Sequence, residues 1–247
     1  MIVPASEGKG SPKVSRIVAH KILDEIVTEK IPAGTRLALE SEMLEQYGVA
    51  RGTLREALRI LETHGLIRMK TGTNGGPIVE DIGTTQFGRS TTFFYRATGC
   101  TLRDLLGARL VIEPAMAREA ARSVDARAAE RMRSTLEAAK VAEDCDGDEW
   151  SEANNEFHNL IVGLSGNHVL DLLARSIVAV VTSMVESHYA ESQDRHAVRR
   201  IHARIAEAII AGNPDEAERL AYRHVKGIAE EIERQAPDLL DRQVDWL

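Results

Sequence analysis

The sequence has few cysteines, few aromatic residues and no long apolar run, and each shortage narrows what the protein can be. The two cysteines, Cys100 and Cys145, show no paired spacing, so a disulfide framework is not indicated and a reducing cytoplasm fits better. No apolar stretch approaches the roughly 18 residues of a membrane span, so we expect no membrane association. Residues 1–13 lack the apolar core of a signal peptide and are rich in Gly, Ser, Pro and Lys, which predicts a flexible tail.

Acidic charge is plentiful, but it is distributed unevenly along the chain. The formal net charge of −7 argues at first against a nucleic-acid partner. Residues 1–80, however, carry 11 Lys and Arg against 10 Asp and Glu, a net charge of +1, whereas residues 81–247 carry 20 against 28, a net charge of −8. Because local charge sets the affinity for phosphate, the N-terminal part remains able to bind DNA.

Residues 49–61 form the most informative stretch of the sequence. Its apolar residues recur at steps of three and four and so share one face of a helix: Leu54, Ala57, Leu58 and Leu61. Arg51, Arg55 and Arg59 lie four apart on a different face, and Gly52 and Thr53 keep the first turn slim. Such a helix suits the major groove of DNA, where arginine bonds to guanine edges or phosphates. The alternative is a solvated basic face on an ordinary surface helix.

The neighbouring segments favour the DNA-binding interpretation. Residues 39–48 predict a short helix that ends at Gly48, whose missing Cβ allows a left-handed turn. Residues 66–70 alternate apolar and basic side chains, residues 71–76 are rich in glycine, and Ile78 and Val79 are apolar. This order predicts a β-hairpin whose tip can approach a phosphate backbone closely. Together the segments predict a winged helix-turn-helix.

From Ile17 to Val79 the sequence resembles the DNA-binding domain of GntR transcriptional regulators, through the runs 32–37, 48–58 and 65–67. Two positions depart from the family pattern: Ala38 replaces a usual proline, and Ser41 replaces an arginine that often reaches DNA. The resemblance and the local charge together give a set of expected DNA-facing positions: Ser41, Arg51, Gly52, Thr53, Arg55, Lys70 and Gly72.

The remainder of the chain predicts helices almost throughout. The expected segments are 102–122, 125–143, 148–164, 167–188, 194–211 and 214–235. Six helices joined by short turns predict an antiparallel bundle. The expected fold is therefore mainly α, with a winged helix-turn-helix at 14–80, a linker at 81–100, an all-α bundle at 101–236 that binds an effector and dimerises, and a C-terminal tail at 237–247. Phe93, Phe94 and Tyr95 do not suit a free linker, so we expect them to anchor it against one domain or to open the first helix of the bundle.

Histidines in this bundle suggest a second site. Asn154 and His158 lie four apart on one helix face, and His202 and His224 lie on two further helices. This order resembles the FCD ligand-sensing domain of FadR-type GntR proteins, in which an Asp and three His hold a divalent metal. The resemblance implies Zn, Ni, Co or Mn at these four residues, with weaker affinity because Asn154 replaces the Asp. The alternative is that each histidine is a hydrogen-bonded core or surface residue.

Arg109 and Glu113 occupy positions where the same family carries an Arg-x-x-x-Glu pair. By that resemblance Arg109 binds an acidic effector, since its guanidinium matches a carboxylate. The alternative is an internal pair between Arg109 and Glu113 along one helix.

These expectations describe a homodimeric regulator that binds an inverted-repeat operator in double-stranded DNA and responds to a small effector, expected to be a carboxylate. Relief of repression by effector is the commoner family mode, so a repressor is expected. A different class, a metal-dependent enzyme that uses the histidine cluster to activate water, is kept as the alternative. A helical module that binds only protein would leave Arg51, Arg55 and the hairpin unexplained.

Overall fold

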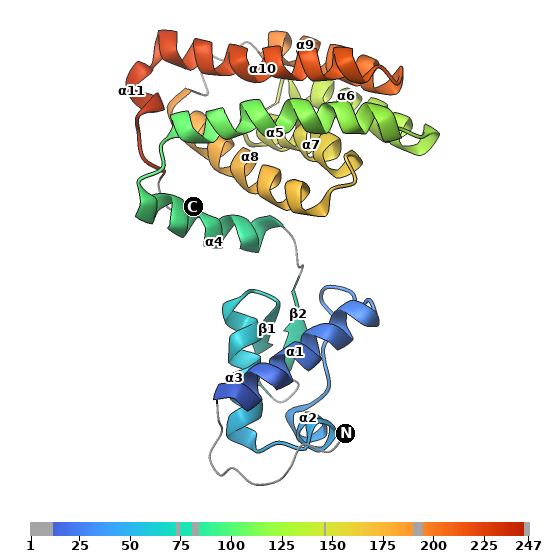
Figure 1. The fold of residues 1–247 in the computed structure, drawn as a ribbon, viewed down its shortest axis with the longest axis vertical. Coiled ribbons are helices and arrows are strands. Elements are labelled where there is room, and N and C mark those ends of the chain that lie inside the picture. The colour runs from blue at the N-terminus through green and yellow to red at the C-terminus, as the bar shows by residue number, and fades with distance from the viewer. Residues whose placement is uncertain (1–11, 73–74, 81–83, 146, 190–194, 245–247) are drawn as a thin grey trace. The chain divides into compact units, whose positions relative to one another are not determined.

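A computed structural model describes residues 12–72, 75–80, 84–145, 147–189 and 195–244 (Figure 1). The chain divides into two compact units, Met1–Gln86 and Phe87–Leu247. Most of the expected N-terminal tail, residues 1–11, lies outside the described residues. The first described helix begins within the remainder of that tail, at Pro12.

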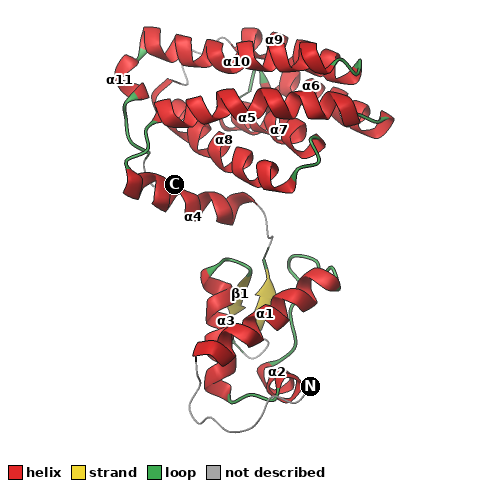
Figure 2. Cartoon of the chain, viewed as in Figure 1, coloured by secondary structure: helices red, strands yellow, loops and turns green. Residues whose placement is uncertain are grey.

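The N-terminal unit contains three helices and one hairpin. The elements are α1 (Pro12–Thr28), α2 (Glu40–Tyr47), α3 (Arg51–Thr63), β1 (Ile67–Lys70) and β2 (Gly76–Val79). The strands pair antiparallel, with Ile67 opposite Val79 and Lys70 opposite Gly76. Figure 2 shows the short sheet beside these helices. The predicted winged helix-turn-helix is therefore confirmed.

Two local features hold the helices of this unit in place. Gly48 ends α2 in the left-handed region with φ 61°, and its amide donates to the carbonyl of Leu44, as its predicted role in the turn requires. The apolar stripe of α3 is buried against α1, α2 and β1, as its spacing predicted: Leu54, Ala57, Leu58 and Leu61. The burial of this stripe leaves the arginine face of α3 toward solvent.

The C-terminal unit is a bundle of helices, drawn green to red in Figure 1. Its main helices are α5 (Leu102–Ser123), α6 (Ala126–Ala142), α7 (Gly147–Leu164), α8 (His168–Tyr189), α9 (Arg195–Ile210) and α10 (Pro214–Gln235). Side chains cap the first turns of α5, α6 and α10. Thr101, Asp125 and Asn213 each accept a hydrogen bond from a backbone amide of the helix that follows. The mainly helical fold class is confirmed, with α5 and α10 side by side across the unit.

The expected linker is largely helical, so that prediction was wrong for α4 (Thr84–Thr98). Its threonines have low helix propensity, but Thr91, Thr92 and Thr98 donate their hydroxyls to carbonyls four residues earlier. Tyr95 also packs against the core of the second unit, whereas Phe94 stays exposed. Tertiary packing thus overrides the weak local preference that suggested a linker.

The expected C-terminal tail also forms part of the core. Residues 237–240 form the short helix α11 (Pro237–Leu240), and Leu239, Leu240 and Val244 are buried. The amide of Val244 donates to the carbonyl of Cys100 at 2.9 Å, and Thr101 and Gln243 form an antiparallel bridge. Three apolar residues are too few to show a helical period, which is why the sequence did not reveal this segment.

By length and composition, one described helix is apolar enough to cross a membrane, over His168–Val185 in α8. The window is not an unbroken apolar run, so the expectation that no such run approaches 18 residues is not contradicted. The segment carries Asp171 and Arg175, which pair at 2.7 Å, and its apolar residues Ile177, Val180 and Val181 are buried in the bundle. These contacts are those of a core helix.

The buried position of Leu240 predicts a measurable role for the last helix. Leu240→Ala is expected to lower the free energy of unfolding of the helical unit by roughly 2–5 kcal/mol, because it leaves a cavity in a packed core. Calorimetry of the full chain measures this change. Val141→Ala, at an exposed position on α6, is the matched control and should stay within about 0.5 kcal/mol of wild type. Unchanged stability of Leu240→Ala would mean that residues 237–247 are a tail after all.

Candidate metal centre and nucleic-acid interface

The N-terminal half of α3 presents the expected cationic face. The side chains of Arg51 and Arg55 are 69% and 66% exposed. Gly52 is exposed between them, and a Cβ at this position would meet no other atom within 4 Å. Thr53 differs, because it is only 6% exposed. Its burial argues against the direct side-chain contact with DNA that the resemblance implied.

The remaining expected DNA-facing positions are also exposed: Ser41 on α2, Lys70 at the end of β1, and Gly72 beyond it. Gly72 has φ 105°, a conformation that side-chain-bearing residues rarely adopt. A Cβ on Gly75 would lie 2.3 Å from the carbonyl oxygen of Lys70, so the hairpin turn closes tightly on glycine. Because glycine carries no side chain, Gly72 and Gly75 leave room for close approach to a phosphate backbone.

The exposed arginines of α3 have acidic neighbours that the sequence analysis did not identify. Glu40 contacts both Arg51 and Arg55, while Arg59 pairs with Glu56 at 2.8 Å. Glu56 lies three residues before Arg59, a spacing that would have signalled their pair. Glu40 lies on the preceding helix, so no local spacing signals its contacts.

The three histidines meet inside the helical unit. His158 comes from α7, His202 from α9 and His224 from α10, and all three are buried. Their ligand nitrogen atoms lie within 4.8 Å of one another, and Nε2 of His202 is 3.1 Å from Nε2 of His224. Two nitrogen ligands of one ion, each roughly 2.1 Å from it, are separated by roughly 3.0–3.4 Å. The pair already has this separation. The same distance is a hydrogen bond between the two imidazoles, as the alternative of hydrogen-bonded core histidines expected, so a metal would have to replace the proton that they share.

The protonation of the cluster suits a metal ligand. Burial lowers the pKa of His202 well below its usual value, with a further contribution from His224. Burial and then the neighbouring His158 lower the pKa of His224 to about 3, although Glu113 opposes this shift. Both imidazoles are therefore neutral at neutral pH, and a neutral imidazole nitrogen is the form that coordinates a metal.

Asn154 supplies the observation that best tests the fit of a metal. Its Oδ1 is buried and has no hydrogen-bond partner within the described parts of the chain. A buried oxygen without a partner costs roughly 1–3 kcal/mol, so it calls for an explanation. Asn154 lies one turn before His158 on α7, and an amide oxygen is a ligand for a divalent cation. The residues present fit the ion that the resemblance implied.

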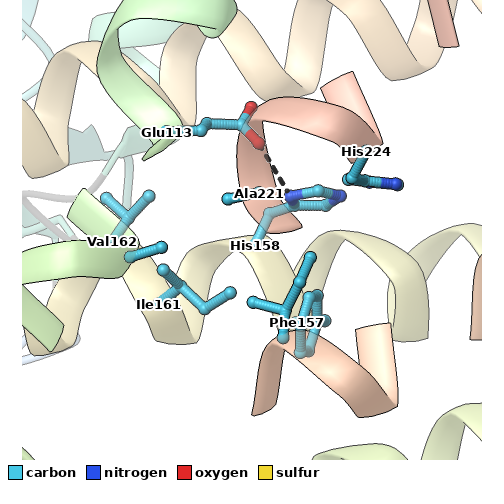
Figure 3. Close-up of a pocket in the computed structure, with 9 residues that line it drawn as sticks. Glu113, Phe157, His158, Ile161, Val162, Ala221 and His224 are labelled. Atoms are coloured by element: carbon cyan, nitrogen blue, oxygen red, sulfur yellow. Dashed lines mark ion pairs between the residues drawn. The ribbon is translucent and has the colours of Figure 1, made fainter. Parts of the chain in front are cut away.

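Glu113 holds one member of the cluster in position. Figure 3 shows its carboxylate directed at the ring of His158, with Nδ1 and Oε2 3.1 Å apart. This contact leaves the other ring nitrogen of His158 for a metal, which is the usual arrangement of a carboxylate behind a histidine ligand. Burial alone would raise the pKa of Glu113, but Arg109 and then His158 lower it, so the carboxylate is ionised.

Arg109 forms the internal pair that the sequence offered as an alternative. Its Nε donates to Glu113, and both side chains are almost fully buried. The pair compensates the charge of each partner inside the bundle. An effector contact at Arg109 stays a prediction, and it would require the guanidinium to exchange partners.

A small cavity adjoins this cluster. Its volume is about 10 Å³, and Figure 3 shows Glu113, Phe157, His158 and His224 among its lining residues. That volume suits about one water molecule or ion, not an organic molecule. Phe157, which the sequence analysis did not assign, stacks on His202 with ring centres 4.0 Å apart and so fixes that imidazole.

Comparison with known proteins gives two matches to family models. Residues 15–74 match the bacterial regulatory proteins of the gntR family, and residues 104–227 match the FCD domain. The first match runs from α1 to just past β1 in the winged helix-turn-helix, and the second includes the three histidines of the helical unit.

Relatives match along most of the chain. The HTH-type transcriptional regulator YcbG of Bacillus subtilis is 27% identical, over 89% of this chain and 90% of its own. The Glc operon transcriptional activator of Escherichia coli is 27% identical over 89% of each chain, and the transcriptional repressor NanR of Cronobacter sakazakii is 26% identical over 91% and 90%. A Streptococcus agalactiae GntR structure has a TM-score of 0.70 at 22% identity, over 87% of this chain and 99% of that one, which shows the fold.

These matches decide between the classes that the sequence left open. The families and relatives are DNA-binding transcriptional regulators, so the alternative of a metal-dependent enzyme was wrong. The FCD match covers half of the chain, and the gntR match covers residues 15–74 of the N-terminal unit. The chain therefore belongs to the GntR family of bacterial regulatory proteins, as a transcriptional regulator with an FCD domain.

Proposed function

We propose that this regulator is a cytoplasmic homodimer that represses transcription from an inverted-repeat operator and releases it when an acidic effector binds the metal-loaded FCD domain. The observation that carries the DNA-binding half is the exposure of Arg51 and Arg55 on the face of α3 that adjoins its buried stripe. Two such helices in a dimer would occupy successive major grooves, about 34 Å apart.

The DNA contacts divide by chemistry. Arg51 and Arg55 carry forked donors suited to guanine, so they are assigned to base edges. Lys70 and Gly72 lie where the hairpin ends, and they are assigned to the phosphate backbone, with Ser41 available on α2. Thr53 is left out of the direct contacts because its side chain is buried.

Arg55→Ala is expected to weaken operator binding by about 1–3 kcal/mol and to relax specificity at the base it contacts. The operator is first selected from a random duplex library with wild-type protein, and binding is then titrated against selected and scrambled duplexes. Lys70→Ala should instead weaken both duplexes equally and reduce the salt slope by about 1. Arg133→Ala, the same charge change in the helical unit, is the control. Failure of wild-type protein to select any sequence contradicts the proposed function.

The metal proposal assigns His158, His202, His224 and Asn154 as ligands of one divalent ion, with Zn, Ni, Co and Mn as candidates. The bound ion would supply positive charge and an open coordination position for a carboxylate. The adjoining cavity of about 10 Å³ is too small for an organic acid, so binding of the effector requires the side chains around that cavity to move apart. Within the chain, Glu113 orients His158, Phe157 holds the ring of His202, and burial keeps two imidazoles neutral. The buried unpaired oxygen of Asn154 supports this assignment.

Asn154→Asp tests the centre in two directions. With a metal present, the added negative charge should raise zinc affinity about tenfold or more, because the new carboxylate faces a cation in a buried site. In chelator-treated protein the same change should lower stability, since it buries an unpaired charge. Zinc titration and thermal unfolding measure the two effects.

His202→Ala should remove the metal, which elemental analysis of the purified protein measures. Wild-type protein purified without chelators and free of metal would refute the centre and leave the DNA-binding proposal intact.

The effector proposal predicts that small carboxylates weaken operator binding. A panel of mono- and dicarboxylates is titrated into zinc-loaded protein on the selected duplex, with the matching amides as neutral controls. An active carboxylate is expected to reduce operator affinity about 5- to 150-fold, the usual range of coupling between sites. Arg109→Lys keeps the charge but loses the fork, so it should blunt the response. Equal effects of acids and amides would contradict an acidic effector.

A reporter gene placed behind the operator should be expressed more strongly in cells that lack the protein. Weaker expression in those cells would contradict repression.

A further inference from the structure

Glu40 joins the two recognition arginines in the N-terminal unit. Its Oε1 lies 3.3 Å from Nε of Arg51 and 3.2 Å from Nε of Arg55, and its Oε2 lies 3.5 Å from Nη2 of Arg55. One carboxylate on α2 thus contacts the guanidinium groups on two successive turns of α3.

The fold brings these residues together across the turn between α2 and α3. Glu40 is the first residue of α2, and the start of this helix is fixed because Glu42 accepts the backbone amide of Leu39 at 2.8 Å. The left-handed turn at Gly48 then directs α3 back past this end of α2. The backbone of Glu40 is therefore held at the start of a helix, and its side chain needs only to reach across the turn to contact α3.

The contacts engage only part of each guanidinium. A guanidinium has five N–H donors, and Glu40 faces Nε of each arginine together with one Nη2 of Arg55. The terminal nitrogens of Arg51 keep donors for another acceptor, as does Nη1 of Arg55. A guanine edge needs two such donors, so each arginine can bind a base while its inner side stays on the carboxylate.

Exposure shows that this arrangement contributes little to stability. The side chains of Arg51 and Arg55 are 69% and 66% exposed, and that of Glu40 is 36% exposed. Ion pairs this open to solvent are worth little in folding, because water and salt screen them. The consequence of the contacts must therefore be sought in the orientation and the charge of the recognition surface.

We propose that Glu40 is a positioning residue that determines specificity: it holds Arg51 and Arg55 side by side for base edges and withholds them from phosphates. The inference rests on the proposed DNA-binding function of α3. A carboxylate beside the two arginines repels the phosphate backbone and lowers their net charge, which weakens binding to any sequence. At the operator, guanine edges accept the free donors without displacing the carboxylate.

The test is Glu40→Gln in the full chain, which removes the charge and preserves the shape. Dissociation constants are measured for the duplex selected by wild-type protein and for a scrambled duplex of equal length, over a series of salt concentrations. Glu45→Gln is the matched control, because it makes the same charge change at an exposed position on the same helix. Thermal unfolding of each variant confirms that the fold is retained.

Glu40→Gln is expected to bind the scrambled duplex more tightly and with a steeper salt dependence, because the released arginines bind phosphates. The affinity of Glu40→Gln for the operator, divided by its affinity for the scrambled duplex, should fall about tenfold relative to wild type. That factor is the discrimination that roughly one bidentate base contact provides. Glu45→Gln should keep the wild-type ratio. A merely structural role of Glu40 would weaken both duplexes together and leave the ratio unchanged.

An unchanged ratio in Glu40→Gln overturns the inference, and so does an equal fall in Glu45→Gln, which would show an effect of total charge alone. Either result leaves the proposed function standing, provided that wild-type protein selects an operator. Failure of wild-type protein to select any duplex is the separate result that rejects the DNA-binding proposal itself. The two failures are therefore distinguishable in one set of measurements.

Discussion

The N-terminal unit depends on the burial of one face of α3. Its apolar stripe packs against α1, α2 and β1, and the stripe member Leu54 is fully buried. A helix that buries one face leaves its other faces to solvent, so Arg51 and Arg55, beside the buried stripe, are directed outward by the same packing that holds the unit together. The hydrophobic core and the DNA-binding surface are two consequences of one helix.

The helical unit meets a different constraint, because it buries polar groups that need partners. Arg109 and Glu113 compensate each other's charge, and Glu113 also orients His158. Burial keeps His202 and His224 neutral, which avoids two further charges in the core. The oxygen of Asn154 is the member of this set without a partner in the described structure. The proposed ion would complete the network, and its loss or gain would alter a buried polar core shared by several helices.

The sequence predicted the elements whose patterns are long or chemically distinct. Helix α3 has a strong 3.6-residue period, and α10 begins with an asparagine cap followed by proline, so both were placed closely. Helix α4 was missed because its threonines and glycine have low helix propensity, and their back-bonded hydroxyls and tertiary contacts become visible only in three dimensions. Residues 237–244 were missed because their few apolar residues show no period. The histidine triad was expected from resemblance, whereas the contacts of Glu40 and Phe157 join separate helices and leave no local signal.

The central claim is that the outward face of α3 binds base edges. The most direct measurement is a crystal structure of the protein bound to the duplex that it selects. The account predicts α3 in the major groove, with the guanidinium groups of Arg51 and Arg55 on guanine edges and the hairpin tip beside the phosphate backbone. A complex in which those guanidinium groups face solvent, or in which another surface of the chain holds the duplex, would contradict it.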